Sequence, residues 1–182
     1  MTKVQSDLAA LAPAMREIAE CFLREAGDLP VRIFETYRDP ARQDALFAQG
    51  TSRARGGASP HNHRLAFDVI LDLKSPIWPV LGQLPLEAPA GDGAWDTGVV
   101  VVKDAAGKRF YRLDRPVVLE VWRGVGRAAK RAAGFDSLRP ASQVWGGDWY
   151  RHGDSSATAH LGWDPGHIQH PEWKRLAGIE KA

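Results

Sequence analysis

The chain has 182 residues, of which 44% are hydrophobic and 25% are charged. This composition is typical of a globular domain and excludes disordered and collagen-like proteins. The net charge is +2, from 24 basic and 22 acidic residues, so composition gives no support for nucleic-acid binding. Cys21 is the single cysteine, which excludes an intramolecular disulfide and a cysteine-based zinc cluster.

The sequence carries no signal for export or membrane insertion. Its first residues contain no apolar segment followed by a cleavage site, and no stretch has eighteen consecutive apolar residues. We therefore expect a protein that has no integral membrane segment and is cytoplasmic as synthesised. We also expect it to be a monomer. Because no internal repeat or second compact module is visible, residues 1–182 are predicted to form one domain.

The N-terminal part predicts a helix followed by a strand. Apolar residues three and four positions apart predict an amphipathic helix over residues 6–25, with Ser6 as its N-cap and Gly27 as its stop. Alternating apolar and polar residues then predict a strand over residues 31–38.

A second helix follows at once. Asp39 is its predicted N-cap and Pro40 its first residue, and the helix continues to residue 47. Arg38 therefore lies where a strand end faces a helix start, which is a common place for a functional group. The alternative is a surface salt bridge from Arg38 to Asp39 or Asp44.

The middle of the chain predicts an insertion and a long helix. Residues 74–114 are expected to form an inserted irregular segment that ends in a hairpin, with strands over residues 97–102 and 108–113. Residues 116–133 predict a helix, with Asp114 as cap and Gly134 as stop. Three arginines recur on this helix every four residues, which favours a solvated face or, less directly, a surface for anionic polymer: Arg123, Arg127 and Arg131.

The stretch from Ser59 to Asp68 carries two histidines in a loop and then enters a predicted strand. Ala66, Asp68 and Ile70 share one face of that strand. A buried, unpaired charge would be costly, so Asp68 needs a counter-charge, and a metal ion shared with a loop histidine would supply one. The alternative is an edge-strand carboxylate that faces solvent.

The C-terminal part supplies further candidate ligands. Asp164 stands three residues before His167 across a Pro-Gly turn, and residues 167–169 predict a short strand. Such a turn can direct both side chains into one space. Catalytic zinc takes three protein ligands and leaves a position for water, which makes His61, Asp68 and His167 the candidate set. Asp164 would then accept a proton from the water, and Arg38 would stabilise an oxyanion or hold a substrate carboxylate.

Four sequence blocks together resemble the zinc peptidases of the D-alanyl-D-alanine carboxypeptidase (VanY-like) and phage L-alanyl-D-glutamate endopeptidase group. They occur in order over most of the chain. They are Tyr37-Arg38 with Gln43, Ser59-x-His61-Asn62 with Ala66-x-Asp68, Trp145-Gly146-Gly147-Asp148-Trp149, and Asp164-x-x-His167.

The resemblance implies roles for these residues. His61, Asp68 and His167 match the Zn²⁺ ligands; Asp164 and Arg38 match the catalytic carboxylate and the transition-state arginine. Gln43 and Ser59 match residues that line the substrate site. The implied fold is a small α+β domain of the hedgehog and D-Ala-D-Ala-peptidase type, in which an antiparallel sheet flanked by helices carries the zinc on one face.

The resemblance has two departures. Arg64 stands where the family motif usually has glycine, and the 74–114 segment is longer than the family's connection. Both concern substrate preference more than zinc binding.

Several polar and aromatic residues near the motifs have alternative interpretations. His63 is a substitute ligand or a residue that lines the pocket or faces water, and His160 and His170 are second-sphere donors or surface residues. Asp148 is a candidate to orient the second ring nitrogen of a ligand. Trp145 and Trp149 are expected in the core rather than as a substrate platform.

We expect a zinc metallopeptidase that hydrolyses bacterial peptidoglycan stem peptides, with the L-Ala-D-Glu bond favoured, as in a phage or prophage endolysin that acts on the cell wall after release. A D-alanyl-D-alanine carboxypeptidase or dipeptidase is the alternative within the same chemistry. An alternative of another class is a non-catalytic wall-binding or phage tail structural protein.

Overall fold

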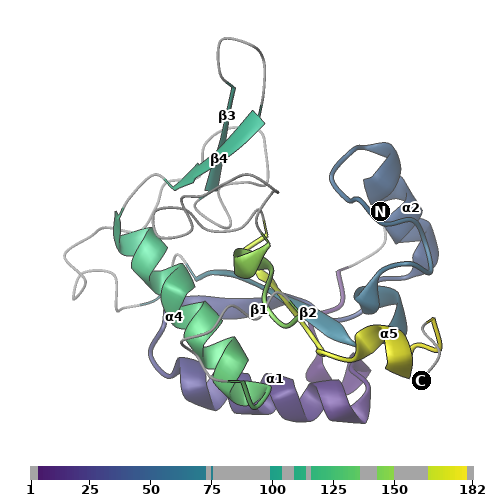
Figure 1. Cartoon of the computed structure of the whole chain (residues 1–182), viewed down its shortest axis with the longest axis horizontal. Helices are drawn as coiled ribbons and strands as arrows, with labels where there is room; N and C mark the ends of the chain where they lie inside the picture. Colours follow the sequence, from purple (N-terminus) through teal and green to yellow (C-terminus); the bar gives the residue numbers. More distant parts are fainter. Residues whose placement is uncertain are drawn as a thin grey trace.

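The computed structural model describes residues 4–72, 75, 99–103, 109–113, 116–135, 143–149 and 164–179. Within these residues the chain has the predicted α+β architecture, with a three-stranded antiparallel sheet in the order β1-β2-β5, a two-stranded sheet β3-β4 and four α-helices (Figure 1). No helix among the described residues is both long enough and apolar enough to cross a membrane. The strands are β1 (Val31–Glu35), β2 (Ala66–Leu71), β3 (Val99–Lys103), β4 (Arg109–Leu113) and β5 (His167–Gln169), and the helices are α1 (Pro13–Ala26), α2 (Pro40–Ala48), α4 (Pro116–Ala132) and α5 (Trp173–Leu176).

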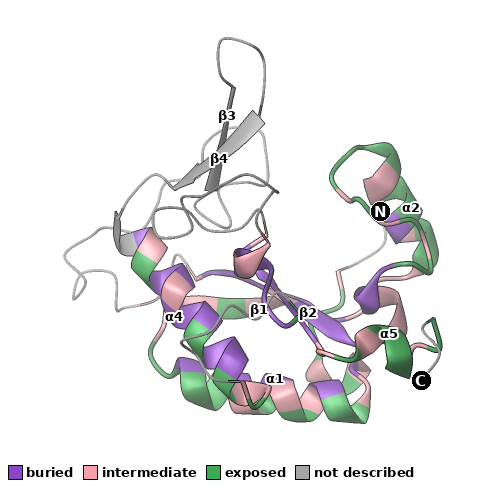
Figure 2. Ribbon diagram, in the orientation of Figure 1, coloured by how far each residue is buried: buried purple, intermediate pink, exposed green. Residues whose placement is uncertain are grey.

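One face of the three-stranded sheet packs against α1 and α4. The central strand β2 directs alternate side chains to this face, and Phe67 is fully buried there with its ring centroid 5.4 Å from that of Phe22 on α1. Figure 2 shows the buried residues of α1 and α4 on the sides that turn toward each other and the sheet. Burying one such aromatic side chain contributes about 1.5–3 kcal/mol, so this layer provides much of the stability of the fold.

Trp145 completes the core through a close approach to α4. A Cβ atom added at Gly126 of that helix would lie 2.3 Å from the Trp145 ring, so only glycine fits there. The indole Nε1 of Trp145 donates to the carbonyl oxygen of Pro165 at 2.8 Å. The prediction of Trp145 as a core residue is confirmed, since it is 4% exposed.

The opposite face of the sheet is polar, and a β-bulge shapes it. β1 pairs with β2 in antiparallel register at Ile33 and Val69, but the register then shifts so that Glu35 lies opposite Asp68. Regular alternation along β1 would put Glu35 on the same face as Ile33, which is the packed face. The extra residue in the bulge instead brings the Glu35 carboxylate to the face of Asp68. β5 pairs with β2 on the other side and places His167 opposite Asp68.

The first predicted helix begins later than expected. A short 3-10 turn, η1 (Leu8–Ala10), comes first, and α1 starts at Pro13. Proline suits the first helical position because its missing N–H would have no partner there, and it disfavours helical backbone at the preceding residue. Asp7, not Ser6, caps the 3-10 turn by accepting from the N–H of Ala9 at 2.8 Å. Gly27 ends α1 with a φ of 52°, as predicted.

The first strand is shorter than predicted. It ends at Glu35 because the N-terminal segment takes over the pairing: the N–H of Thr36 donates to the carbonyl oxygen of Gln5 at 2.7 Å. Asp39 caps α2 through the N–H of Arg42 at 2.9 Å, which confirms the predicted cap.

The structure describes the strands of the predicted hairpin in the central region. β3 and β4 pair in antiparallel register, from Val99 opposite Leu113 to Lys103 opposite Arg109, which confirms the hairpin strands. Residues 76–98, the connection 104–108 and the predicted cap Asp114 lie outside the described residues. The predicted helix 116–133 is α4, followed by Gly134 at a φ of 77°.

Candidate metal centre

The loop before β2 holds His61 in a fixed place. His61 lies in a 3-10 turn, η2 (Pro60–His63), and is 1% exposed. The side chain of Asn62 ties this turn to its surroundings: its oxygen accepts from the N–H of Gly57 at 2.9 Å and its nitrogen donates to the carbonyl oxygen of Arg38 at 2.7 Å. The turn ends at Arg64, whose left-handed φ of 62° returns the chain to the sheet. This conformation explains why glycine suits the position.

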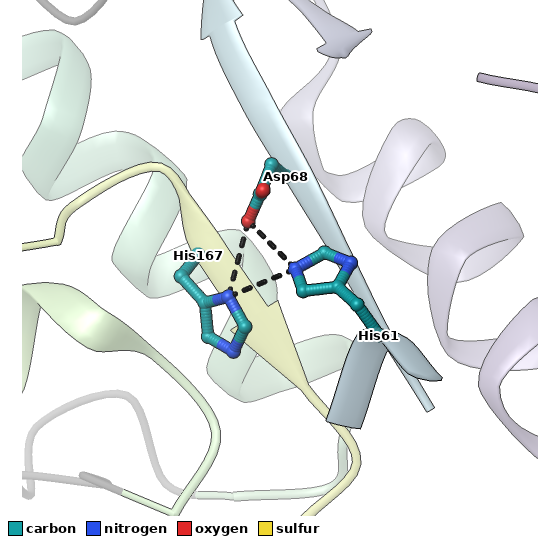
Figure 3. A group of neighbouring side chains, drawn as sticks. All are labelled: His61, Asp68 and His167. Carbon is teal, nitrogen blue, oxygen red and sulfur yellow. Dashed lines mark hydrogen bonds and ion pairs between the residues drawn. The ribbon is translucent and has the colours of Figure 1, made fainter. Parts of the chain in front are cut away.

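Three side chains from η2, β2 and β5 converge on one point (Figure 3). His61 Nε2 lies 3.1 Å from Asp68 Oδ1 and 3.2 Å from His167 Nδ1, and the latter atom lies 3.0 Å from Asp68 Oδ1. The metal ligands that the sequence predicted are therefore together, and among the described residues they are the group of three that could hold a metal ion.

The spacing of these atoms fits a metal ion with short bonds. Tetrahedral zinc with bonds of about 2.0 Å separates its ligand atoms by about 3.3 Å, close to the observed 3.0–3.2 Å. Nitrogen and carboxylate oxygen are also a donor set that zinc accepts. The Nδ1 atom of His61 is buried with no hydrogen-bond partner among the described residues.

Gln169 sets the tautomer of His167. Its side-chain nitrogen donates to the carbonyl oxygen of Gln143 at 3.0 Å, so its oxygen is the atom that faces His167 Nε2 at 3.1 Å. Nε2 must then carry the proton, and Nδ1 presents its lone pair to Asp68 and His61. Sequence reasoning missed this role, although Gln169 stands on the same strand face as His167, two residues away.

Burial and the charges of the neighbouring side chains both shift the pKa values of His61, Asp68 and His167. Burial lowers the pKa of His61, which favours the neutral imidazole that a metal requires. Burial alone would raise the pKa of Asp68, but His61 and His167 outweigh it and hold the pKa well below its usual range. Burial likewise opposes protonation of His167, yet the hydrogen bond that a protonated His167 would donate to Asp68, together with the negative charge of that carboxylate, raises the pKa of His167.

Asp164 lies at the edge of the same site. It precedes a tight turn in which the N–H of His167 donates to its carbonyl oxygen at 3.2 Å. A Cβ atom at Gly146 would lie 2.1 Å from that oxygen, so the neighbouring turn approaches this closely only with glycine. Burial, together with the charge of Asp68, raises the pKa of Asp164 to about 6, against the opposing charges of His167 and Arg38.

Arg38 is bound by several side chains at the end of β1. Its Nη2 donates to Asp68 Oδ2 at 3.2 Å and also to Glu35. Its Nε donates to Glu35 Oε2 at 2.8 Å, and its Nη1 donates to Gln43 Oε1 at 2.9 Å. Burial opposes its charge, but Asp68 and Glu35 outweigh this and raise the Arg38 pKa. The alternative prediction, a surface salt bridge from Arg38 to Asp39 or Asp44, is wrong. Those carboxylates accept from the backbone N–H groups of Arg42 and Gly56 instead.

The two residues predicted to line the substrate site differ in position. Ser59 lines the cavity beside His61. Gln43 is fully buried behind Arg38, and its nitrogen donates to Ser52 Oγ at 2.6 Å and to the carbonyl oxygen of Ala54 at 2.7 Å. Gln43 therefore holds the arginine and the 51–54 loop in place.

A cavity of about 700 Å³ contains the candidate ligands, Asp164 and Arg38. The aromatic and basic side chains in its remaining wall are Phe34, Arg42, Arg53, Trp149 and Trp173. The Trp149 ring centroid lies 5.0 Å from that of His167, so this tryptophan borders the site and is half-buried rather than in the core as predicted. The volume of the cavity and its mixed polar and apolar lining suit a short peptide.

The other candidate polar residues lie outside the group of three. Asp148 forms an ion pair with Lys130 Nζ at 2.8 Å. The second ring nitrogen of His167, which Asp148 was predicted to orient, is bound by Gln169 instead. His63 Nε2 donates to the carbonyl oxygen of Gly57 at 2.8 Å, and His170 Nδ1 accepts from the N–H of Glu172 at 3.1 Å. His160 lies outside the described residues.

No protein-family model matches the chain, and no curated protein matches its sequence.

Proposed function

We propose that this chain is a zinc-dependent peptidase that hydrolyses peptidoglycan stem peptides, with the bond between L-alanine and D-glutamate as its target. One observation carries the proposal: His61, Asp68 and His167 present ligand atoms 3.0–3.2 Å apart in a cavity that Asp164 and Arg38 also line. Support also comes from the resemblance of the four sequence blocks to VanY-like carboxypeptidases and phage endopeptidases, and we propose the hedgehog-type fold that this resemblance implies.

The metal would be held by His61 Nε2, Asp68 Oδ1 and His167 Nδ1. Zinc bound by three protein ligands lowers the pKa of a coordinated water to about 7 and polarises a carbonyl group. Asp68 supplies the negative charge of the ligand set, and its ionised form is favoured by the neighbouring histidines. The hydrogen bond from His167 Nε2 to Gln169 keeps the ring in the orientation that directs Nδ1 to the same point.

Asp164 has the properties of a general base near neutral pH. With a pKa of about 6 it is mostly ionised at pH 7, yet basic enough to take a proton from an attacking water. The same carboxyl group would return that proton to the leaving amine. Arg38 contributes a fixed positive charge beside Asp68, which stabilises negative charge that develops on the carbonyl oxygen.

Digestion of purified bacterial sacculi tests the reaction and its bond specificity. The zinc-loaded protein is expected to release fragments with new N-terminal D-glutamate, identified by mass spectrometry. Release of free D-alanine, or of the D-alanyl-D-alanine dipeptide, would instead assign a carboxypeptidase or dipeptidase. Zinc binding and wall binding without any cleavage would replace the enzyme by a non-catalytic wall-binding or phage tail structural protein.

The substitution Asp164→Ala tests the proposed proton transfer. We expect zinc binding to persist and hydrolysis to fall by about 100- to 10,000-fold, the usual contribution of a general acid-base group. Zinc content is measured by atomic emission and hydrolysis by release of amino termini. Asp28→Ala, at an exposed position after α1, is the matched control and should leave both unchanged. Undiminished wall lysis by the Asp164→Ala protein would remove this residue from the mechanism.

A further inference from the structure

Arg38 has little capacity left to bind a substrate. A guanidinium has five N–H donors, and in Arg38 they make four hydrogen bonds to Glu35, Gln43 and Asp68. A carboxylate bound side-on needs two parallel N–H donors from one edge of the group. Arg38 could provide that edge only by giving up one of its buried partners, so it is a fixed charge rather than a carboxylate clamp.

Arg42 is differently placed. It lies in the first turn of α2, lines the same cavity, and binds the other oxygen of Glu35: Arg42 Nε donates to Glu35 Oε1 at 2.9 Å. Its side chain is 24% exposed, against 13% for Arg38. Among the described residues Glu35 is the one partner of its guanidinium, so the N–H groups of Nη1 and Nη2 remain for a ligand.

Glu35 holds both arginines in position. Its side chain is 1% exposed, and each of its oxygens faces one guanidinium, which fixes the two cations on adjacent parts of the wall. A guanidinium held at Nε loses little further conformational freedom when a ligand binds. Arg42 therefore presents a preorganised pair of terminal nitrogens.

The charge of the cavity favours an anionic ligand. Among the described residues, the arginines that line it are Arg38, Arg42 and Arg53, and three carboxylates balance them, Glu35, Asp68 and Asp164. A divalent cation on the ligand group would leave this balance positive by two charges. A substrate carboxylate would offset part of that excess, whereas a neutral peptide would not.

We propose that Arg42 is a carboxylate-binding residue that takes a free carboxylate on the substrate residue next to the scissile bond. This inference rests on the proposed function and extends it to the class of peptide. Both D-glutamate in an L-Ala-D-Glu substrate and the terminal D-alanine of a D-Ala-D-Ala substrate offer a carboxylate beside that bond. Peptides in which that carboxylate is blocked as an amide would be poor ligands.

The test compares two peptides on four proteins. The peptides are N-acetyl-L-alanyl-D-glutamate with its α-carboxylate free, and the same peptide with that group amidated. Binding is measured by calorimetry on zinc-loaded protein carrying Asp164→Asn, which prevents turnover, alone or combined with Arg42→Gln, Arg42→Lys or Arg24→Gln. Arg24 lies in the last turn of α1, outside the cavity, and its change removes the same charge as Arg42→Gln.

We expect the acid to bind about 10- to 100-fold more tightly than the amide when Arg42 is present, the usual range for a charge-assisted hydrogen-bonded pair. Arg42→Gln should abolish most of this preference while leaving the affinity for the amide within about twofold. Arg42→Lys, which keeps the charge but loses the planar fork, should retain a small part of it. Arg24→Gln should retain all of it.

Three results would overturn the proposal. They are equal binding of acid and amide by the protein with Arg42, equal weakening of both peptides by Arg42→Gln, and no binding of the acid at millimolar concentration. Equal weakening would mean that Arg42 acts through Glu35 and Arg38 and does not touch the ligand.

Hydrolysis of both peptides by the chain without Asp164→Asn is measured separately. If neither is cleaved, the proposed function fails, and the binding data still decide the role of Arg42.

Discussion

The two faces of the three-stranded sheet are made from alternate residues of the same strands, yet they have opposite characters. On β2, Phe67 is buried against α1, whereas its neighbour Asp68 faces the two histidines. On β5, Ile168 is fully buried in the core and His167 faces the site. The comparison shows how a small domain can hold polar groups close together: the packed face keeps the strands in register, and the register places the ligand atoms.

Removing an aromatic ring from the packed face should have the largest effect. Phe67→Ala is expected to lower the free energy of unfolding by about 3–5 kcal/mol, because it removes fully buried surface and leaves a cavity between β2 and α1. Urea denaturation followed by circular dichroism measures the change. Leu23→Ala on the exposed side of α1 is the control, expected to shift stability by less than about 0.5 kcal/mol. The zinc content of the Phe67→Ala protein that remains folded should be unchanged, and its loss would mean that the two faces are not separable.

Changing the adjacent residue on the polar face should affect the metal rather than the fold. Asp68→Asn keeps the shape of the side chain but removes the charge of the ligand set, so zinc affinity is expected to fall by at least about 100-fold. Competition with a chromophoric chelator measures the affinity, and Asp28→Asn is the charge-matched control. Zinc affinity that survives the change would place the ion elsewhere.

The polar face should also set the pH dependence. A base must be deprotonated to act, and burial raises the pKa of Asp164 to about 6, so activity should be present above that pH and fall about tenfold per unit below it. Bound zinc adds positive charge, which shifts the acidic limb of kcat/KM to pH 6 or lower. The limb should disappear from the residual activity of Asp164→Asn. An identical acidic limb in that variant would assign the titration to another group.

The smallest effect is expected at Arg64, in the turn between η2 and β2. Arg64 has a left-handed backbone, which costs about 1 kcal/mol in a residue other than glycine, and its guanidinium lies 5.4 Å above the Tyr37 ring. Arg64→Gly relieves the strain but loses this contact and adds unfolded-state entropy, so stability should change by less than about 1 kcal/mol. Arg64→Ala keeps the strain and loses the contact, and thermal denaturation should find it the less stable of the two. The reverse order would show that the backbone is not strained.

The candidate ligand set was predictable because its members occur in short local patterns. The alternation of β2 directs Asp68 away from Phe67, and the Pro-Gly turn places Asp164 beside His167. Asp39 and Pro40 likewise predict the start of α2 by local capping preferences. In the structure α2 begins at Pro40, and Asp39 is its N-cap. Such local features need no knowledge of the rest of the chain.

The supporting residues were not predictable in this way. Glu35 reaches Arg38 and Arg42 only because β1 has a bulge whose position depends on pairing with β2. Lys130 binds Asp148 across residues that are distant in sequence, which removed Asp148 from its expected role. These partners depend on contacts between separate elements, so no local pattern contains them.

By itself, the sequence determined which residues are the candidate ligands and on which side of a strand each one stands, because side-chain alternation and turn preferences act over a few residues. Only the tertiary structure decided how those residues are held: the antiparallel pairing that brings His167 opposite Asp68 and the buried carboxylate that fixes two arginines. The physical reason is that the distances between ligand atoms depend on how β2 and β5 pair and how α1 and α4 pack against them, and packing is a property of the whole core.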